Sequence, residues 1–573
     1  MNRKFTALCL ACAMLAPISA MPVSAEVCDV SVSSGAWNFE SIKTYGDFEY
    51  DISDEGSIVI VGYIGASGKA EIPSKIKGKT VTSISHRAFY NCSQLTEITI
   101  PDTVTKIGVD AFLNCSSLKK INIPASVEYF GSMDMVSASR GYNIYDVAVE
   151  GGTYQTDLIA FNVFKGCSSL TEINVDSANK NFKSVDGVLF TNDMSTLITY
   201  PGGKTGAYTV PSGAKIMCIE AFSSNPHLTE VKFSEGFEKI ETKAFLNCTG
   251  LKTVELPKSL TGIGYDAFRG CTALESIDIP RNLSELDNGA FTDCTGLKAV
   301  NVDSANSNFV SVDGVVYDKN ITSLLIYPKS KPGTYAIPET VTSLKTNFAN
   351  CKGLTGVFIP KNLTSLYQTC FSNCENLKFI RVDPNNSSLT SVNGVVFSKD
   401  LSELRFYPTG RKGTYVVPNT TKKIASGSFL YAQGITDLVV PDSVTEIAGE
   451  NTDLQGYTSA LGWYAFEGAG NLKIKANPGS YAESYAGVNN IPFSNITPED
   501  LKEPVKFGDI DGDGKITSSD SLSTLRYSVG LEKFSEEVEN AADVNLDGEI
   551  DSADSLALLR SSVGFVDTNT FVD

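Results

Sequence analysis

One pattern of apolar positions repeats through most of the chain. After Phe89, apolar residues fall at Cys92, Leu95, Ile98 and Ile100, and the same offsets recur after Phe245. The anchor residues of the pattern are Phe89, Phe112, Phe164, Phe222, Phe245, Phe268, Phe291, Phe348, Phe371, Phe429 and Phe466. Many anchors are 23 residues apart. Within each unit, the spacing of the apolar positions follows neither a sustained helical period nor plain strand alternation. The pattern therefore predicts stacked coils, each with a turn at Ala-Phe, a strand after the leucine and a proline corner.

Three of the longer units predict an additional hairpin. They contain the dipeptides Asp186-Gly187, Asp313-Gly314 and Asn393-Gly394, flanked by β-branched and aromatic residues, and this combination favours a tight hairpin turn. Each of these units then reaches a Tyr-Pro dipeptide, at Tyr200, Tyr327 or Tyr407. We interpret the three tyrosines as structural corners. The alternative is that they form platforms on which sugar rings stack.

A single coil cannot bury its own apolar face, so neighbouring coils must stack. Stacking places the short strands side by side in a parallel sheet and makes the whole region an extended, curved rod. The ends of such a rod need caps. Residues 46–79 predict an N-terminal β cap, and residues 477–486 predict a turn followed by a short closing helix.

The repeated motif Ala-Phe-x-x-Cys-x-x-Leu-x-x-Ile-x-Ile-Pro resembles the BspA-like family of bacterial leucine-rich repeats. The resemblance covers about residues 46–495. It implies an α/β-type leucine-rich-repeat solenoid with short parallel strands and few helices. Members of the family are surface or secreted proteins that bind other proteins or host and matrix ligands. The resemblance thus implies a protein or carbohydrate ligand that the sequence does not identify.

Two acidic loops near the C-terminus carry the clearest chemistry. Their residues fall at positions 1, 3, 5, 7, 9 and 12 of a calcium-binding loop, with glycine at position 6. The ligand positions are Asp509, Asp511, Asp513, Lys515, Thr517 and Asp520 in the first loop and Asp543, Asn545, Asp547, Glu549, Asp551 and Asp554 in the second. Position 7 would supply its backbone carbonyl. The alternating oxygen donors predict two Ca²⁺ sites, because Ca²⁺ takes six to eight oxygen ligands.

Each loop is followed by a helical pattern, and the two copies align at an offset of 34 residues. Pro498 and Pro504 disfavour a helix before the first loop. A loop followed by an exiting helix, twice, resembles a type I dockerin, a small all-α calcium-binding module, over about residues 507–566. Dockerins bind cohesin modules on scaffoldin proteins and build cellulosomes. The resemblance therefore implies a cohesin partner.

In the dockerin family, contact with cohesin is made by residues at the start and in the middle of each exiting helix. The matching positions here are Ser518, Ser519, Leu525, Arg526 and Gly530 in the first copy and Ser552, Ala553, Leu559, Arg560 and Gly564 in the second. The near-identity of the copies implies that either one binds. For Leu525 and Leu559, a purely structural role between the two helices stays open.

Charge and cysteine content narrow the functional classes. The formal charge of −19 argues against nucleic acid and against an anionic membrane surface. Of the 13 cysteines, eight sit three residues after an anchor phenylalanine. A cysteine repeated at one coil position predicts core packing rather than a disulfide framework or a metal site. Cys28, Cys218 and Cys370 lie off this ladder.

The N-terminus predicts export. Arg3 and Lys4 precede an apolar stretch from Phe5 to Ile18, and cleavage is expected after Ala25. We therefore expect a secreted, extracellular protein without membrane insertion. The predicted organisation is a signal peptide at 1–25, an N-terminal region with its β cap at 26–80, the solenoid with its C-terminal cap at 81–495, a linker at 496–506 and the dockerin at 507–573.

No sequence signature of catalysis is present. The two histidines, His86 and His227, lie in different coils and are expected in surface turns, and there is no metalloprotease, hydrolase-elbow or phosphate-loop motif. The chain is therefore predicted to be non-catalytic. The alternative is a carbohydrate-binding or polysaccharide-degrading subunit, because a carboxylate pair for glycoside hydrolysis is recognised by geometry and not by a motif.

One group of strand positions breaks the polar trend of the solenoid surface. The positions eight and ten residues after each anchor should face solvent and are mostly polar, but Phe358, Phe379, Arg381 and Val439 also occupy them. These four residues form a candidate ligand patch. The alternative is that a hairpin of a long unit covers them.

Overall fold

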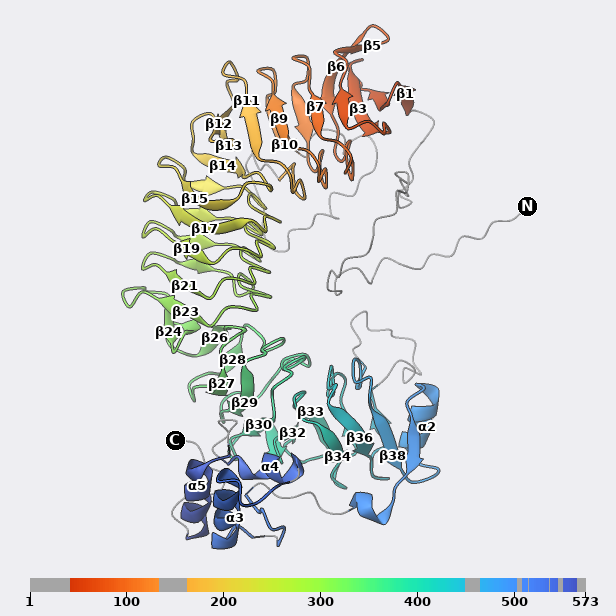
Figure 1. Cartoon of the computed structure of the whole chain (residues 1–573), viewed down its shortest axis with the longest axis vertical. Coiled ribbons are helices and arrows are strands. Elements are labelled where there is room, and N and C mark those ends of the chain that lie inside the picture. The colour runs from red at the N-terminus through yellow and green to blue at the C-terminus, as the bar shows by residue number, and fades with distance from the viewer. Residues whose placement is uncertain are drawn as a thin grey trace, which may run out of the picture.

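The computed structural model describes residues 42–132, 162–448, 464–501 and 508–563 of the 573, apart from residues 514, 535 and 545–549. The coils follow one another along an arc, and a group of three helices lies beside its C-terminal half (Figure 1). The signal peptide expected at 1–25 and Cys28 lie outside the described residues.

The main parallel ladder forms as the repeat predicts. Its strands pair one coil apart, so that Val231 lies opposite Val254 and Val357 opposite Ile380. The strands of this set are β7 (Glu97–Thr99), β9 (Lys120–Ile123), β11 (Glu172–Val175), β15 (Gly206–Val210), β17 (Leu228–Phe233), β19 (Thr253–Glu255), β21 (Ser276–Ile279), β23 (Ala299–Val302), β27 (Gly333–Ala336), β29 (Leu354–Ile359), β30 (Phe379–Val382), β34 (Gly413–Val416), β36 (Ile435–Val439), β38 (Lys473–Ala476) and β39 (Phe493–Asn495).

A second, shorter parallel ladder was not predicted. It forms after the proline corner, where Ile240 lies opposite Ile263 of the next coil. Most of these strands contain only two residues, which is too few for the sequence to show the alternation of a strand. Only the stacking of the coils reveals them. They are β8 (Lys106–Gly108), β10 (Tyr129–Ser132), β16 (Ile216–Met217), β18 (Lys239–Ile240), β20 (Gly262–Ile263), β22 (Glu285–Leu286), β28 (Ser343–Leu344), β35 (Lys423–Ile424) and β37 (Glu446–Ile447).

The three predicted hairpins are present. Each turn has positive φ at both central residues, for example +49° at Asp313 and +75° at Gly314, as a type I′ turn requires. A third strand returns antiparallel and joins the short ladder. The hairpin units are β12 (Phe182–Val185), β13 (Val188–Thr191) and β14 (Thr196–Thr199); β24 (Phe309–Val312), β25 (Val315–Asp318) and β26 (Ser323–Ile326); and β31 (Leu389–Val392), β32 (Val395–Ser398) and β33 (Glu403–Phe406).

The core of the rod is a stack of rings beside a stack of thiols. The rings of Phe245 and Phe268 are 5.1 Å apart between centroids and inclined by only 1°. The Cys248 Sγ donates a hydrogen bond to the carbonyl oxygen of Phe222 in the preceding coil at 3.0 Å. All ten cysteines in the described part of the chain are buried, which confirms the packing role predicted for the eight on the ladder; Cys218 and Cys370, which lie off the ladder, are buried as well. Burial also raises the pKa of the Cys248 thiol to about 12.

The Tyr-Pro tyrosines continue the ring stack where a hairpin interrupts it. Tyr200 stacks on Phe222 at 4.7 Å between centroids, and Tyr407 stacks on Phe429 at the same distance. All three tyrosines, including Tyr327, are 2% exposed. Burial raises the pKa of Tyr407 to about 12. The structural interpretation is confirmed, and the sugar-platform alternative is wrong because these rings have no free face.

Both caps of the rod form. At the N-terminus, β1 (Lys43–Tyr45), β2 (Phe48–Ile52) and β3 (Ile58–Tyr63) pair antiparallel, and β4 (Lys69–Glu71), β5 (Lys75–Ile76) and β6 (Lys79–Ile84) connect them to the first coils. At the other end, helix α2 (Tyr481–Val488) begins at the N-cap Ser480, whose side chain accepts a hydrogen bond from the Glu483 N–H. A 3₁₀ turn, η3 (Pro498–Leu501), follows it.

The C-terminal module is helical, as predicted. Helices α3 (Ser518–Ser528) and α5 (Ser552–Ser562) follow the two acidic loops. A further helix, α4 (Glu536–Ala542), precedes the second loop and was not anticipated. A small core of its own, with Ile510, Val544 and Leu558 buried, holds the module together.

Candidate functional site

The first acidic loop gathers three carboxylates in space. One oxygen from each of Asp509, Asp511 and Asp520 lies within 4.8 Å of the others. Asp509 and Asp520 are buried, while Asp511 is exposed. Like charges brought this close out of water repel one another unless a cation lies between them. The donor set, all hard oxygens, therefore fits Ca²⁺ and disfavours the softer metals.

Backbone hydrogen bonds shape this loop. The Asp520 carboxylate accepts hydrogen bonds from the backbone N–H of Asp511, at 3.2 Å, and of Thr517, at 2.7 Å. The Asp513 carboxylate accepts one from the Lys515 N–H at 2.8 Å. Thr517 is also the N-cap of α3 and forms a capping box with Asp520. A single carboxylate thus joins the loop to the start of its helix.

The second loop repeats this arrangement in its described residues. Asp551 caps α5 and forms the same capping box with Asp554, whose carboxylate accepts the Asp551 N–H at 2.9 Å. Asp543 and Asp554 are buried, as their counterparts Asp509 and Asp520 are. The predicted ligands Asn545, Asp547 and Glu549 lie outside the described residues.

The two copies pack as a near-symmetric pair. The Ser521 hydroxyl donates to the Ser555 carbonyl oxygen at 2.7 Å, and the Ser555 hydroxyl donates to the Ser521 carbonyl oxygen at 2.8 Å. These serines are 34 residues apart, which is the offset of the sequence duplication. The reciprocal bonds set α3 against α5, so that the outer faces of both helices are presented in the same way.

The predicted recognition residues lie on those outer faces. Ser518, Ser519 and Arg526 of α3 are exposed, as are Ser552, Ala553 and Arg560 of α5. Leu525 is 40% exposed and Leu559 is 42% exposed. The alternative that the two leucines are core contacts is therefore wrong; Leu558 takes that place. Gly530 is exposed, and Gly564 lies outside the described residues.

Four further apolar residues extend the exposed faces and were missed in the sequence. Leu522 and Val529 on the first copy correspond to Leu556 and Val563 on the second, with exposures of 49% against 48% and 64% against 61%. Leu522 and Val529 form a stripe with Leu525, and Leu556 and Val563 form one with Leu559, at spacings of three and four residues, which is one face of a helix. The sequence could have revealed these stripes, because the same apolar spacing occurs in both copies, 34 residues apart. Large exposed aliphatic residues in matched rows indicate a protein-binding surface.

The candidate ligand patch on the solenoid is not an open surface. Phe379 is 6% exposed and Val439 is 1% exposed, while Phe358 and Arg381 are half-buried. The prediction that these strand positions face solvent is therefore wrong for Phe379 and Val439. Val439 lies in register between Val416 and Lys475, and the Lys475 ammonium is held by ion pairs to Asp437 and Asp500.

Phe379 is covered by its own neighbours. Its ring fills the space above Gly356 on the adjacent strand, where an added Cβ would lie 1.8 Å from the ring. The Phe358 ring meets it edge-on with centroids 5.5 Å apart. The turn of the third hairpin lies against its backbone, since a Cβ on Gly394 would be 2.7 Å from the Phe379 Cβ. The hairpin alternative therefore holds for Phe379.

This packing predicts a cost for Gly394→Ala. The residue has φ +72°, where an L side chain costs about 1–2 kcal/mol, and the new methyl would also clash with Phe379. Gly413→Ala is the matched control, because Gly413 has φ +77° and open space around its Cα. Chemical unfolding should show a larger loss of stability for Gly394→Ala than for Gly413→Ala. Equal losses would mean that the hairpin turn does not press on Phe379.

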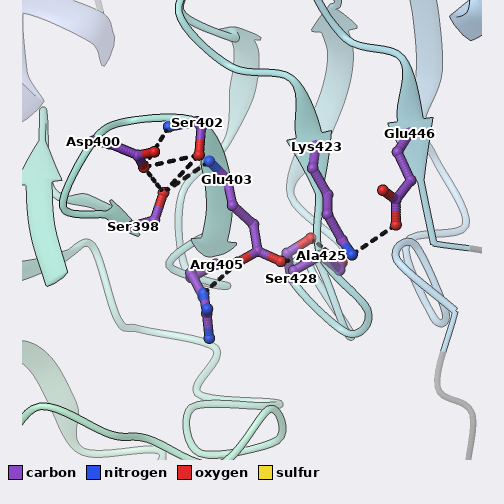
Figure 2. Close-up of polar contacts among 9 residues, drawn as sticks. All are labelled: Ser398, Asp400, Ser402, Glu403, Arg405, Lys423, Ala425, Ser428 and Glu446. Carbon is purple, nitrogen blue, oxygen red and sulfur yellow. Dashed lines mark hydrogen bonds and ion pairs between the residues drawn. The ribbon is translucent and has the colours of Figure 1, made fainter. Parts of the chain in front are cut away.

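A small hollow on the short ladder carries mixed charge. It has a volume of about 120 Å³ and is lined by Leu366, Gln368, Glu403, Arg405, Phe406, Lys423, Ala425, Ser426 and Ala448. The Glu403 carboxylate lies between the Arg405 Nε, at 2.7 Å, and the Lys423 Nζ, at 3.9 Å (Figure 2). Lys423 also pairs with Glu446 at 2.6 Å. Glu403 is the one carboxylate that lines this hollow, so the hollow does not hold the carboxylate pair of a glycoside hydrolase.

Neither histidine is arranged for chemistry. The His86 ring Nδ1 hydrogen-bonds the Val109 carbonyl oxygen at 2.8 Å, and burial lowers the pKa of His86. His227 is exposed, in another coil. His86 is therefore half-buried rather than on the surface, with a structural partner.

In the described part of the chain, no helix combines the length and the apolar character that crossing a bilayer would need.

Comparison with protein families gives two matches. A BspA type leucine rich repeat region matches in six copies over residues 69–196, 215–332 and 327–450. A dockerin type I domain matches over residues 507–561. No curated protein matches the chain.

Several solved structures are similar. A leucine rich cell surface protein from Faecalibacterium prausnitzii is 19% identical, with a TM-score of 0.40, over 80% of this chain and 96% of that one. A leucine-rich repeat protein from Bacteroides ovatus is 22% identical, with a TM-score of 0.34, over 79% of this chain and 100% of that one. The pneumococcal vaccine antigen PcpA is 20% identical, with a TM-score of 0.33, over 60% of this chain and 93% of that one.

Proposed function

Because the chain belongs to the BspA-type leucine-rich repeat family and carries a type I dockerin domain, we propose that it is a secreted, non-catalytic cellulosome component. The signal peptide at 1–25 exports it, and the dockerin at 507–573 anchors it to a cohesin module of a scaffoldin. The solenoid at 81–495 presents a surface that binds a protein or a cell surface. It follows the N-terminal region at 26–80 and precedes the linker at 496–506. The observation that carries the proposal is the pair of matched apolar stripes on α3 and α5.

Two Ca²⁺ ions organise the anchoring module. The first is held by Asp509, Asp511, Asp513, the Lys515 carbonyl, Thr517 and Asp520. The second is held by the equivalent set from Asp543 to Asp554. What supports the first site is the convergence of three carboxylates within 4.8 Å. When bound, the cation offsets the repulsion among these acids and fixes the position at which each recognition helix begins.

Cohesin binds one helix face at a time. The stripe of leucine and valine supplies apolar contact area, and Arg526 or Arg560 adds a guanidinium, a group over-represented at interface hot spots. The equal exposure of corresponding residues in α3 and α5 supports two equivalent modes of binding, with the module rotated by half a turn between them. Each face is a complete alternative to the other.

The test is binding to a panel of purified type I cohesin modules in Ca²⁺. Leu525→Ala with Arg526→Ala removes one face, and Leu559→Ala with Arg560→Ala removes the other. Either pair alone should weaken binding by no more than a few-fold, because the other face remains. All four changes together should weaken it at least 100-fold, since hot-spot truncations cost about 2 kcal/mol or more each.

Leu531→Ala is the control, because Leu531 is 79% exposed but lies beyond α3 and outside the stripe. It should bind like the wild type. Wild-type binding by the four-residue variant would overturn the proposed recognition face. Complete loss of binding from one pair alone would show that a single face is used.

A further inference from the structure

The small hollow on the short ladder lies where that ladder is interrupted. Strand β33 pairs with β32 and β35, and in the described part of the chain it pairs with no strand of the preceding coil. Gln368 belongs to that preceding coil, Arg405 belongs to β33, and both line the hollow. A similar interruption precedes the second hairpin unit, where β22 and β26 lie in different sheets. The second hairpin unit therefore shows how the same boundary is built elsewhere in the rod.

A side chain bridges the second boundary, whereas the third boundary stays open. At the 80-residue offset between the two hairpin turns, Asn288 corresponds to Gln368. Asn288 donates a hydrogen bond across the second boundary to the carbonyl oxygen of Lys345. The residue equivalent to Lys345 is Ala425, whose carbonyl oxygen instead accepts from the Ser428 hydroxyl at 2.7 Å (Figure 2). Within the described part of the chain the Gln368 side chain makes no hydrogen bond, so its amide can bind a ligand.

The third boundary also carries charges that its counterparts lack. Three positions are charged in the third unit and uncharged in the second, and the pairs are Glu403 and Ser323, Arg405 and Leu325, and Lys423 and Ser343. The first unit has uncharged residues there as well, namely Thr196, Ile198 and Ile216. All three units form the same three strands, so the fold does not require these charges. Their presence in the one unit beside the hollow indicates a role in binding.

The charged groups leave hydrogen-bonding capacity in the hollow. The Arg405 Nε is engaged by the Glu403 carboxylate at 2.7 Å, but its Nη1 and Nη2 have no partner in the described part of the chain. The Lys423 Nζ pairs with Glu446 at 2.6 Å and is 3.9 Å from the Glu403 Oε1, which is too far for a hydrogen bond. A guanidinium edge, a carboxylate oxygen and an amide are therefore available together.

This lining favours a neutral ligand rich in hydroxyl groups. An anion would meet the Glu403 carboxylate, and a cation would meet Arg405 and Lys423. A hydroxyl group both donates and accepts, so it suits the mixed set of groups. The remaining lining includes Leu366 and Phe406, which can pack against C–H groups. The volume of about 120 Å³ is below the roughly 300–1,000 Å³ of sites for larger ligands, so it suits one ring.

We propose that this hollow binds a single neutral sugar ring. Glu403, Gln368 and the open edge of Arg405 hydrogen-bond its hydroxyl groups, and Leu366 and Phe406 pack against its C–H groups. The ring is either a free sugar or the terminal unit of a glycan, because the chemistry recognised is the same. A ligand of about a dozen non-hydrogen atoms should bind with a Kd of about 1 mM. The inference goes beyond the proposed function and does not depend on the dockerin.

Saturation-transfer NMR on the full-length secreted chain tests the inference, because the method detects millimolar binding to a large protein. The probes are glucose, galactose, mannose and xylose, each as the free sugar and as its methyl glycoside. At least one of the four sugars should bind. A methyl glycoside that binds as well as its free sugar identifies a glycan end, and binding of the free sugar alone identifies a soluble sugar. Either result supports the site.

Glu403→Ser combined with Arg405→Leu is the test variant, because the second unit carries these two residues in the same fold. It should weaken sugar binding about tenfold or more, since hydrogen bonds to two charged groups are lost, and it should leave the circular dichroism spectrum unchanged. Arg281→Leu is the matched control. Arg281 also pairs with a carboxylate, that of Asp303 at 3.3 Å, but it lies in an earlier coil outside the hollow. It should bind sugar like the wild type.

The inference is overturned if no neutral probe binds, or if the double variant binds the probes as tightly as the wild type. Sodium glucuronate and glycine are tested alongside. Tighter binding of either one than of every neutral sugar, lost in the double variant, would also overturn it, by identifying an anion or a zwitterion as the ligand. The double variant should bind cohesin in Ca²⁺ like the wild type, so failure of the sugar site leaves the proposed function standing.

Discussion

Replacing Asp520 by alanine is expected to abolish cohesin binding, with a loss of at least 100-fold. This one carboxylate is a predicted Ca²⁺ ligand, accepts backbone hydrogen bonds across the first loop and closes the capping box of α3. Its removal weakens Ca²⁺ binding, so the charge of the buried Asp509 is no longer offset. It also removes the acceptor for the backbone N–H of the N-cap Thr517. Metal binding and folding are coupled in such small modules, so the losses reinforce one another.

The effect should exceed that of truncating one recognition face. Because α3 and α5 are held together through Ser521 and Ser555, a first loop that cannot form disturbs both faces and not only its own. Titration of Asp520→Ala should show one Ca²⁺ site lost, and far-UV circular dichroism should show reduced helix. Ser519→Ala, at an exposed position of the same turn, is the control and should keep both ions. Wild-type cohesin affinity for Asp520→Ala, or wild-type cohesin binding in excess EDTA, would contradict the calcium argument.

The second large effect is expected from Phe268→Ala in the solenoid. Phe268 is fully buried, with the rings of Phe245 and Phe291 stacked on either side at 5.1 and 5.4 Å between centroids. Truncating a buried phenylalanine typically costs about 3–5 kcal/mol, because the transfer free energy is lost and a cavity remains. In a stack where each coil contacts only its neighbours, the cavity disrupts two interfaces.

Chemical unfolding followed by circular dichroism measures this loss. Hydrogen exchange should locate it in the coils on both sides of residue 268, with the N-terminal and C-terminal coils still protected. Tyr367→Ala is the control, because Tyr367 is 60% exposed and its loss should change stability by less than about 0.5 kcal/mol. A loss below about 1 kcal/mol for Phe268→Ala would contradict a continuous ring stack.

The elements that sequence predicted well are those that depend on near neighbours or on a repeat. The hairpin turns follow from Asp-Gly and Asn-Gly, because those residues tolerate the positive φ that a tight turn needs. The first loop and its helix follow from a run of local ligands and a local cap. The stack of rings and thiols follows from identical offsets in successive coils, since equal coils place equal residues above one another.

Other features depend on partners that the repeat does not reveal. Asn306 is 1% exposed, and its amide donates to the carbonyl oxygens of Pro280, at 2.9 Å, and Leu283, at 3.0 Å, in the preceding coil. Its side-chain oxygen also accepts from the Asn308 and Phe309 N–H groups. Asn179 and Asn386 make the same contacts in their own units. In the sequence these residues are ordinary turn asparagines.

The sequence by itself determined the periodic rod, its hairpins and the two acidic loops, because each is specified by residues adjacent along the chain or repeated at one spacing. The tertiary structure decided which surfaces are available. It placed Tyr200, Tyr327 and Tyr407 inside the ring stack, covered Phe379 and Val439, and left both rows of leucine and valine on α3 and α5 exposed. The exposure of a side chain depends on what packs against it from distant parts of the chain, and a local sequence pattern does not specify those contacts.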